Sequence, residues 1–283
     1  MISVLQLGTL DYATGLGLQR KLVDLRKENR IGDVLVLLEH PPVITLGRNA
    51  RQQNILASPE LLAERGVEVH ECDRGGDVTF HGPGQLVGYP IFDLRGLPSS
   101  EAKRKSLGAI EYVRRLEEVL IRTCAGLGIP AGRIAGLTGV WTRPILAEPP
   151  PARTGDDARP RVGPHGLEAK IAAIGVHISR GVTSHGFALN VNTDLDYFSL
   201  IIPCGISARP VTSIAKELGE ALRLQEVAHA VSRNFGTLFA SQILWLDSLD
   251  ALLAHNPGNH TGVPVKLPAE LRKLHEEEET FLG

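Results

Sequence analysis

The chain has 283 residues, 43% of them hydrophobic and 22% charged, a composition typical of a folded globular protein. Its 30 basic and 32 acidic residues leave a net charge of −2, whereas a dedicated nucleic-acid-binding protein usually has a basic excess. No apolar run approaches the ~18 residues of a membrane helix, and the N-terminus lacks the pattern of a signal peptide. Three cysteines do not make a secreted disulfide framework. We therefore expect a cytoplasmic protein with neither a nucleic-acid nor a membrane partner.

The N-terminal third alternates short apolar runs with one helical pattern. Leu18, Leu22 and Leu25 recur at the spacing of a helix face. The run 33–38 is continuously apolar, which places it in the middle of a sheet. Further strands are predicted at 2–7, 43–46, 67–69, 79–80 and 86–91.

A long helix is predicted over 101–125, because apolar residues step by three or four along it. The predicted buried face of this helix consists of Leu107, Ile110, Val113, Leu116, Leu120 and Cys124. Strands are expected at 140–141, 170–178 and 187–191, and helices near 211–220 and 223–240.

Between 143 and 169, about a third of the residues are proline or glycine, which predicts a flexible insertion. The polar stretch from 247 onward is predicted to be an appendage with little core of its own. We therefore expect an α+β domain over 1–245, built on a mixed sheet flanked by helices, and a C-terminal appendage over 246–283.

The densest cluster of polar residues and glycines is RGGDVTFHGPGQ at 74–85. Paired glycines let backbone N–H groups approach a ligand, and polar side chains can surround it. Gly82, Gly84 and Gly88 have the wrong spacing for a dinucleotide fingerprint, and they precede a strand where that motif precedes a helix. The cluster favours a ligand-binding loop over a decorated hairpin.

The three cysteines differ in their surroundings. Cys124 lies on an apolar helix face and is predicted to be buried, while Cys72 follows a short strand and is expected to be partly exposed. Cys204 stands between Pro203 and Gly205, in a turn that either presents a reactive side chain or holds a structural cysteine.

Two sets of residues could gather around a metal, but neither has the short paired spacing of a zinc site, so we expect no metal and no other cofactor. These sets are His70, Cys72 and His81, and His177 with His185.

Six motifs in order resemble the lipoate-protein ligase B family of octanoyltransferases, over roughly residues 1–245. The most specific is RGGDVTFHGPGQLVGYP at 74–90. The others are EHPP leading to TLGR at 39–48, GVW at 139–141, KIAAIG at 170–175, SHGFALN at 184–190 and PCG at 203–205. The insertion at 143–169 and the tail depart from the family pattern.

The resemblance implies the fold of biotin ligases and lipoate ligases, and an acyl transfer in two halves. An octanoyl (or lipoyl) group leaves acyl carrier protein, forms a thioester on the enzyme, and passes to a lysine of a lipoyl domain. The acceptors would be the apo lipoyl domains of 2-oxoacid dehydrogenases and the glycine cleavage carrier protein. By motif position the nucleophile is Cys204 and its partner is Lys170. Substrate binding falls to Arg74, Gly75, Gly76, Asp77, Val78, Thr79, Phe80, His81, Ala173, Ile174, Gly175, Gly186, Phe187 and Ala188.

The chemistry of these side chains agrees with the implied roles. A thiolate is the nucleophile in thioester exchange, and a nearby ammonium favours the thiolate. Backbone N–H groups of Gly75, Gly76 or Gly82 are candidates for stabilising an oxyanion, and Val78, Phe80, Ile174 and Phe187 are candidates for an apolar acyl slot. One alternative is an ATP-dependent lipoate or biotin ligase, a class that needs no nucleophilic thiol. The other is a catalytically silent protein that binds carrier domains, and the presence of both Lys170 and Cys204 argues against it.

Overall fold

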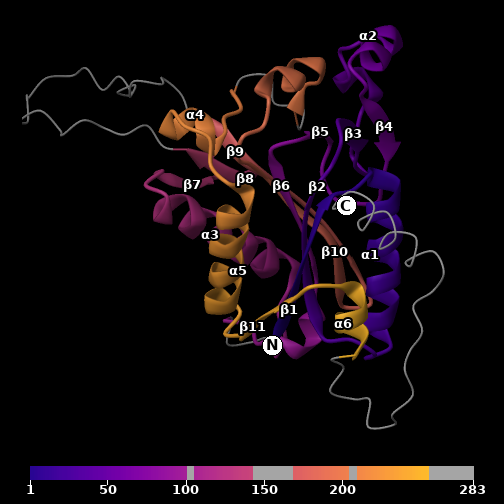
Figure 1. Cartoon of the computed structure of the whole chain (residues 1–283), viewed down its shortest axis with the longest axis vertical. Helices are drawn as coiled ribbons and strands as arrows, with labels where there is room; N and C mark the ends of the chain where they lie inside the picture. Colours follow the sequence, from indigo (N-terminus) through magenta and orange to yellow (C-terminus); the bar gives the residue numbers. More distant parts are fainter. Residues whose placement is uncertain (101–104, 143–167, 204–208, 255–283) are drawn as a thin grey trace, which may run out of the picture.

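The computed structural model describes residues 1–100, 105–142, 168–203 and 209–254, and a large mixed sheet is its centre (Figure 1). The strands on one side of the sheet run parallel, β1 with both β11 and β2, and the remaining neighbours are antiparallel. The predicted buried strand is confirmed, because β2 lies between β1 and β6 and its inner residues are fully buried. In spatial order the strands are β11 (Ile243–Leu246), β1 (Ile2–Thr9), β2 (Asp33–Glu39), β6 (Gln85–Ile91), β10 (Val182–Asn190), β9 (Lys170–Ser179), β8 (Leu137–Thr142) and β7 (Ala131–Ile134).

A second, three-stranded sheet sits at one end of the first. Its strand order is β4 (Glu68–Glu71), β3 (Val43–Leu46), β5 (Val78–His81), and the short helix α2 (Pro59–Glu64) lies beside it (Figure 1). The sequence predicted these strands but not that they form a sheet of their own. The loop from β4 to β5, which carries the glycine-rich cluster, is thereby held against β9, since the Gly75 amide donates to the Val176 carbonyl.

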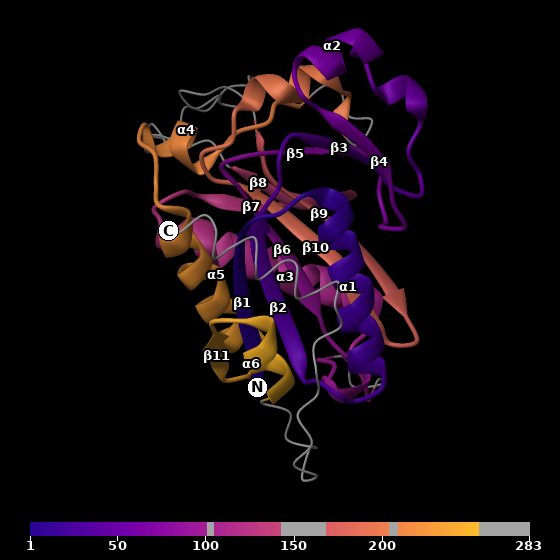
Figure 2. The same ribbon diagram turned by 45° about the vertical axis from the view of Figure 1, so that its right-hand side comes forward.

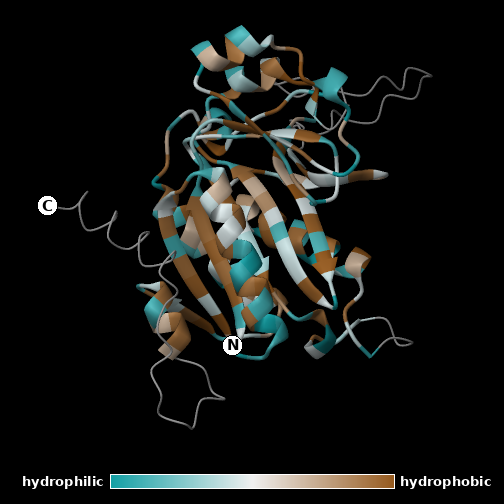
Figure 3. Cartoon of the chain, turned by 90° about the vertical axis from the view of Figure 1, so that its right-hand side faces the viewer, coloured by the Kyte–Doolittle hydropathy of each residue, from teal (hydrophilic) through white to brown (hydrophobic). Residues whose placement is uncertain are grey.

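Helices cover both faces of the large sheet (Figure 2). On one face, α3 (Ala109–Gly126) and α5 (Leu224–Leu238) bury an apolar cluster that includes Leu116, Leu120 and Phe235. On the other, α1 (Tyr12–Lys27) buries the predicted stripe Leu18, Leu22 and Leu25. The central strands between these layers are largely hydrophobic (Figure 3). The predicted α+β class with a mixed, helix-flanked sheet is confirmed.

The long helix starts later than predicted. It begins at Ala109, after the N-cap Gly108, and residues 105–108 are not helical. Leu116, Leu120 and Cys124 are fully buried as expected, but Ile110 is 77% exposed. The prediction for Ile110 is wrong because the true stripe runs through Tyr112, Leu116 and Val119, which turns Ile110 away from the sheet. The other predicted helices are shorter than expected, with α4 at Ile214–Leu218 and α5 at Leu224–Leu238.

The end of the described chain joins the core. The predicted boundary at 245 falls inside β11, which pairs with β1 along Ile2–Leu5. Beyond it, α6 (Leu249–Ala254) places Leu252 in the cluster under α1 with 3% exposure. The expectation of little core beyond 247 is therefore wrong for α6, and residues 255–283 lie outside the described chain.

The burial of Leu252 gives a test of this packing. Leu252→Ala is expected to lower the free energy of unfolding by about 2–4 kcal/mol, through lost apolar burial and the cavity that remains. The matched control is Ile110→Ala, expected to change it by less than about 0.5 kcal/mol because the side chain is exposed. Urea unfolding measures both. Equal effects would contradict the assignment of α6 to the core.

The predicted insertion lies outside the described residues except at its C-terminal end. There the Thr142 amide donates to the Ala169 carbonyl at 2.8 Å, so the two sides of the insertion meet at the end of β8 and the start of β9. No helix in the described ranges is long and apolar enough to cross a membrane.

Candidate active site

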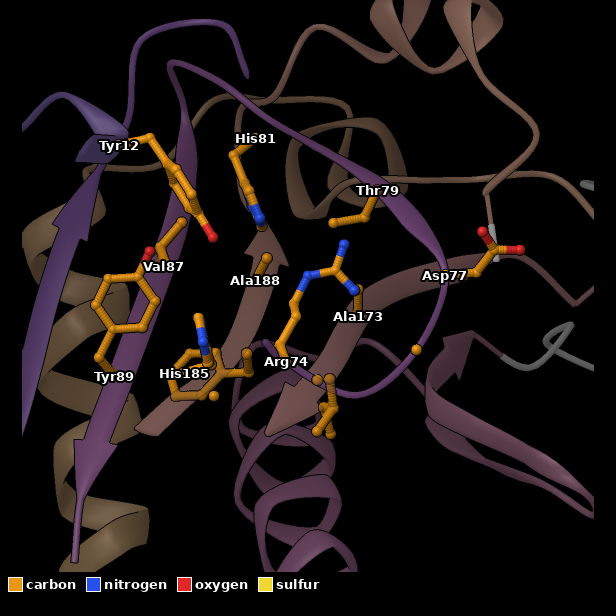
Figure 4. A pocket seen from close by; sticks show the side chains of 15 residues that line it. Tyr12, Arg74, Asp77, Thr79, His81, Val87, Tyr89, Ala173, His185 and Ala188 are labelled. Atoms are coloured by element: carbon orange, nitrogen blue, oxygen red, sulfur yellow. The ribbon is translucent and has the colours of Figure 1, made fainter. Parts of the chain in front are cut away.

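A cavity of about 50 Å³ lies between the glycine-rich loop and strands β6, β9 and β10 (Figure 4). All the predicted substrate-binding residues except Gly75, Val78 and Phe80 line it. Four further residues line it that were not predicted to bind substrate: Tyr12, Val87, Tyr89 and His185. Tyr89 and His185 fall inside the quoted motifs, whereas Tyr12 begins α1 and reaches the cavity only through the fold.

Strand alternation explains why two of the predicted residues are absent from the cavity. Successive side chains of a strand point to opposite faces, so on β5 Thr79 and His81 face the cavity. Val78 and Phe80 face the core of the small sheet, with 0% and 1% exposure. The Phe80 ring stacks on Tyr197 there, at 4.8 Å between centroids. Of the four candidates for an apolar acyl slot, only Ile174 and Phe187 line the cavity.

Arg74 is a structural anchor of the cavity wall. The side chain is buried, and its Nε and Nη2 donate to Thr45 Oγ1 at 3.2 and 2.9 Å. Nη2 also donates to the Thr45 carbonyl at 2.7 Å, and Nη1 to the Gly75 carbonyl at 3.1 Å. The guanidinium is thus already committed to protein acceptors, and it shapes the loop around the cavity.

A chain of buried hydrogen bonds continues from this anchor. His81 Nδ1–H donates to Gln85 Oε1 at 2.7 Å, and Gln85 Nε2 donates to Asn190 Oδ1 at 2.8 Å. Asn190 Nδ2 then donates to the Thr212 carbonyl at 2.9 Å, and the Thr212 amide donates to the Lys170 carbonyl at 2.9 Å. The network therefore links the cavity wall to the backbone of Lys170.

Tyr89, which lines the cavity, is hydrogen-bonded to the buried His40. His40 Nδ1–H donates to the Leu10 carbonyl, which leaves Nε2 to accept the Tyr89 hydroxyl at 2.6 Å. Burial lowers the pKa of His40 to about 4 and raises the pKa of Tyr89. Both groups are therefore neutral at pH 7, so Tyr89 contributes an uncharged side chain to the cavity wall.

His185, which also lines the cavity, has a strained backbone conformation. His185 has φ +54°, which is uncommon for a residue other than glycine, and its amide donates to Gln19 Oε1 at 2.7 Å. Its Nε2 contacts Asp73 Oδ1 at 2.7 Å, and His177 Nε2 lies 3.6 Å from Asp73 Oδ2. Burial would raise the pKa of Asp73, but the hydrogen bond and charge of His185 outweigh it and lower the pKa. The pair pins the glycine-rich loop to β10.

Lys170 lies at the start of β9, largely buried at 8% exposure. Trp141 of β8 pairs with Lys170 while Val140 pairs with Ala172, so β9 carries an extra residue here, as in a bulge. The Lys170 Nζ lies 5.1 Å from the centre of the Trp141 ring, within reach of a cation–π contact. The bulge and the indole together fix the direction of the ammonium group.

Gly139 leaves the space that the lysine stem occupies. Its φ of +120° suits glycine, and a Cβ there would come within 2.8 Å of Lys170 Cε. The Gly139 amide donates to Glu117 Oε1 at 3.2 Å. The side chain of Glu117 is fully buried, and it also accepts from Arg133 Nε at 2.9 Å and Arg114 Nη1 at 2.7 Å. A carboxylate on α3 therefore supports the glycine against which Lys170 packs.

Cys204 lies outside the described residues, but the chain on both sides of it is described. Before it, the Ile202 amide donates to the Asn54 carbonyl at 2.8 Å. After it, the Pro210 carbonyl accepts from the Lys170 amide at 2.8 Å, and Val211 pairs with Lys170 in a parallel bridge. The backbone of Lys170 thus holds the described chain that follows Cys204, at Pro210 and Val211.

The remaining predictions concern glycines, cysteines and metals. The Gly75 amide donates to Val176, so of the three oxyanion candidates only Gly76 and Gly82 remain. Cys124 is buried and Cys72 is half-buried, as predicted. In the described part of the chain, no three His, Cys, Asp or Glu side chains are grouped to hold a metal ion.

The buried histidines predict a pH dependence of stability. Burial lowers the pKa of His81 to about 3, whereas an unfolded histidine titrates near 6.5. The unfolded state therefore binds more protons below pH 6.5, and the stability present above that pH is lost as the pH falls toward 3. His81→Gln is expected to reduce this slope by up to about 1.4 kcal/mol per pH unit. Urea unfolding at pH 4–7 measures it, and an unchanged slope would show that His81 titrates normally.

Comparison with known proteins identifies the class to which this fold belongs. The family described as "Lipoyl protein ligase A/B catalytic domain" matches residues 11–236. A bipartite lipoate protein ligase from Thermoplasma acidophilum has the same fold, with a TM-score of 0.62 at 16% identity over 98% of this chain and 91% of that one. The chain belongs to the lipoyl protein ligase A/B catalytic domain family.

Relatives within the family identify the type of enzyme. A protein of Koribacter versatilis named octanoyltransferase is 59% identical over 98% of both chains. Another of that name, from Acidobacterium capsulatum, is 56% identical over 89% of this chain and 96% of its own. The resemblance seen in the motifs is confirmed, and the chain is an acyltransferase of the octanoyltransferase type.

Proposed function

We propose that the chain transfers an octanoyl group from acyl carrier protein to a lysine of a lipoyl domain, through a thioester on Cys204. The observation that carries this proposal is the placement of Lys170. Its backbone holds the chain that follows Cys204, and its ammonium lies over Trp141 at the start of β9. Ala173, three residues further along β9, already lines the cavity, so an acyl chain in the cavity would have its reacting end toward Lys170.

In the first half-reaction, the Cys204 thiolate attacks the thioester carbonyl of the donor. A new C–S bond forms on the enzyme, and the phosphopantetheine thiolate leaves and takes up a proton. In the second half, the ε-amine of the acceptor lysine attacks the enzyme thioester, an amide forms, and the Cys204 thiolate is regenerated. Lys170 gives the proton to the leaving thiolate in the first half and accepts one from the attacking amine in the second. The Gly76 and Gly82 amides are the candidates for stabilising the tetrahedral oxyanion.

The proposed partners are those that the resemblance to octanoyltransferases implies. Octanoyl-acyl carrier protein is the donor, and the acceptors are apo lipoyl domains of 2-oxoacid dehydrogenases and the glycine cleavage carrier protein. The lipoate protein ligase of Thermoplasma acidophilum is described together with its E2 lipoyl domain, which supports an acceptor of this kind for a protein of the same fold.

The experiment is an intact-mass measurement after incubation with octanoyl-acyl carrier protein, without ATP. We expect one added octanoyl group that hydroxylamine removes, and its loss in Cys204→Ala but not in Cys72→Ala. Loss of the adduct in Cys72→Ala instead would assign the nucleophile to Cys72. Transfer of free octanoate that requires ATP would favour a ligase, and absence of any transfer would favour a silent carrier-domain binder.

A further inference from the structure

One buried residue joins the cavity wall to the chain that leads to Cys204. Asn54 ends the short helix η1 (Gln52–Asn54) and is 7% exposed. Its Nδ2 donates to Asp77 Oδ2 at 2.6 Å, and its backbone carbonyl accepts from the Ile202 amide at 2.8 Å. Asp77 lines the cavity, and Ile202 stands two residues before Cys204 in the sequence.

Both sides of this connection are held by other contacts. Asp77 Oδ1 accepts from the Val78 amide at 2.7 Å and the Arg51 amide at 3.2 Å, so the carboxylate cannot turn freely. Next to Ile202, Ile55 pairs with Ile201 in an antiparallel bridge. Asn54 therefore stands at the end of a short segment that pairs with the chain before Cys204. Its backbone carbonyl binds the Ile202 amide, and its side chain binds Asp77.

We propose that Asn54 is a positioning residue for acylation of Cys204, because it ties Ile202, in the described chain that leads to Cys204, to Asp77 in the cavity wall. The inference rests on the proposed function, because it assumes that Cys204 carries the acyl group. The chain after Cys204 is held by the backbone of Lys170, and Asn54 gives the corresponding hold before it. A displacement of about 1 Å of reacting groups can cost on the order of 100-fold in rate. Losing the side-chain contact with Asp77 lets the Asn54 backbone, whose carbonyl binds the Ile202 amide, shift, so acylation slows although the nucleophile remains.

Exchanging the two side chains tests the contact. Asn54→Asp places two carboxylates side by side. In Asp77→Asn, the new side-chain NH2 group faces another N–H donor in either orientation of the amide, because Asn54 Nδ2 lies on one side and the Val78 and Arg51 amides lie on the other. Asn54→Asp combined with Asp77→Asn restores a donor and an acceptor of the same size and charge. The matched control is Asn49→Asp, an exposed residue outside the cavity on the same loop.

The measurements are the rate of Cys204 acylation by octanoyl-acyl carrier protein, followed by intact mass, and the melting temperature. We expect each single variant to acylate about 10- to 100-fold more slowly, the double variant to recover to within about threefold of the wild type, and Asn49→Asp to match the wild type. Recovery is a result that a merely additive loss of two structural residues would not give.

Several outcomes would overturn the inference. Folded single variants that acylate at the wild-type rate would show that the contact does not position Cys204. If the single variants fail to fold, a double variant that folds but acylates slowly would show the same. Absence of any adduct on Cys204 in the wild type would overturn the proposed function itself, and the inference with it.

Discussion

Replacing Lys170 by alanine is expected to move the pH midpoint of Cys204 alkylation upward by about one to three units. An opposite charge within about 4–6 Å favours the ionised form of an acid by this amount, and alkylation requires the thiolate. The variant should therefore react more slowly at pH 7 and approach the wild-type rate near pH 10. Octanoyl transfer should fall further, because the second half-reaction also needs a proton acceptor.

Arginine at the same position separates the two roles. Lys170→Arg keeps a cation but cannot give up a proton near neutral pH, so the alkylation midpoint should stay close to that of the wild type while octanoyl transfer is lost. Lys216→Ala, on the exposed side of α4, is the control and should change neither. Peptide mass spectrometry reports Cys204 separately from Cys72. If Lys170→Ala leaves the midpoint unshifted, Lys170 does not favour the thiolate, and a role in binding the substrate carbonyl would replace that assignment.

Removing the carboxylate of Glu117 is expected to destabilise the fold by about 2–4 kcal/mol. Its side chain is 0% exposed and accepts hydrogen bonds from Arg114, Arg133 and the Gly139 amide. Glu117→Ala leaves the buried Gly139 amide without its acceptor, which costs about 1–3 kcal/mol, and loses one partner of a buried ion pair. The two arginines are partly exposed and can regain water, so the loss stays below the upper range for such pairs.

The neighbouring residue provides the control. Glu118 contacts Arg122 and Arg133 at 3.0 and 2.9 Å, but its side chain is 30% exposed. Glu118→Ala is therefore expected to cost less than about 1 kcal/mol. Urea midpoints at constant m-value measure both. Equal losses of unfolding free energy for the two variants would mean that the buried position of Glu117 adds nothing to its contribution to stability.

Part of the cavity was predictable from the sequence, because five of its fifteen lining residues lie in the single segment 74–81. Eight consecutive residues form the glycine-rich loop and β5, and their unusual composition is visible without a structure. The error at Val78 and Phe80 was avoidable, since alternation along a strand already separates them from Thr79 and His81. The motif therefore identified the right segment. The alternation of side chains along the strand then shows which of its residues face the cavity and which face the core.

Other parts depended on contacts between distant segments, which no local pattern reveals. Tyr12 reaches the cavity because α1 packs across β10, and Asn54 acquires its role from Ile202. The exposure of Ile110 followed from where the helix begins. A repeat of apolar residues every three or four positions predicts a helix but leaves its first turn open, and here the glycine at 108 fixes it.

The pairing of β1 with β11 has a consequence for synthesis of the protein. The first strand emerges from the ribosome with its outer edge unpaired, and residues 243–246 that cover this edge are made near the end of the described chain. Until then β1 has only β2 as a neighbour, and an unpaired strand edge is prone to associate with other chains. A chain that stops before Ile243 would keep that edge permanently open, so premature termination should yield aggregation and not a shorter working enzyme.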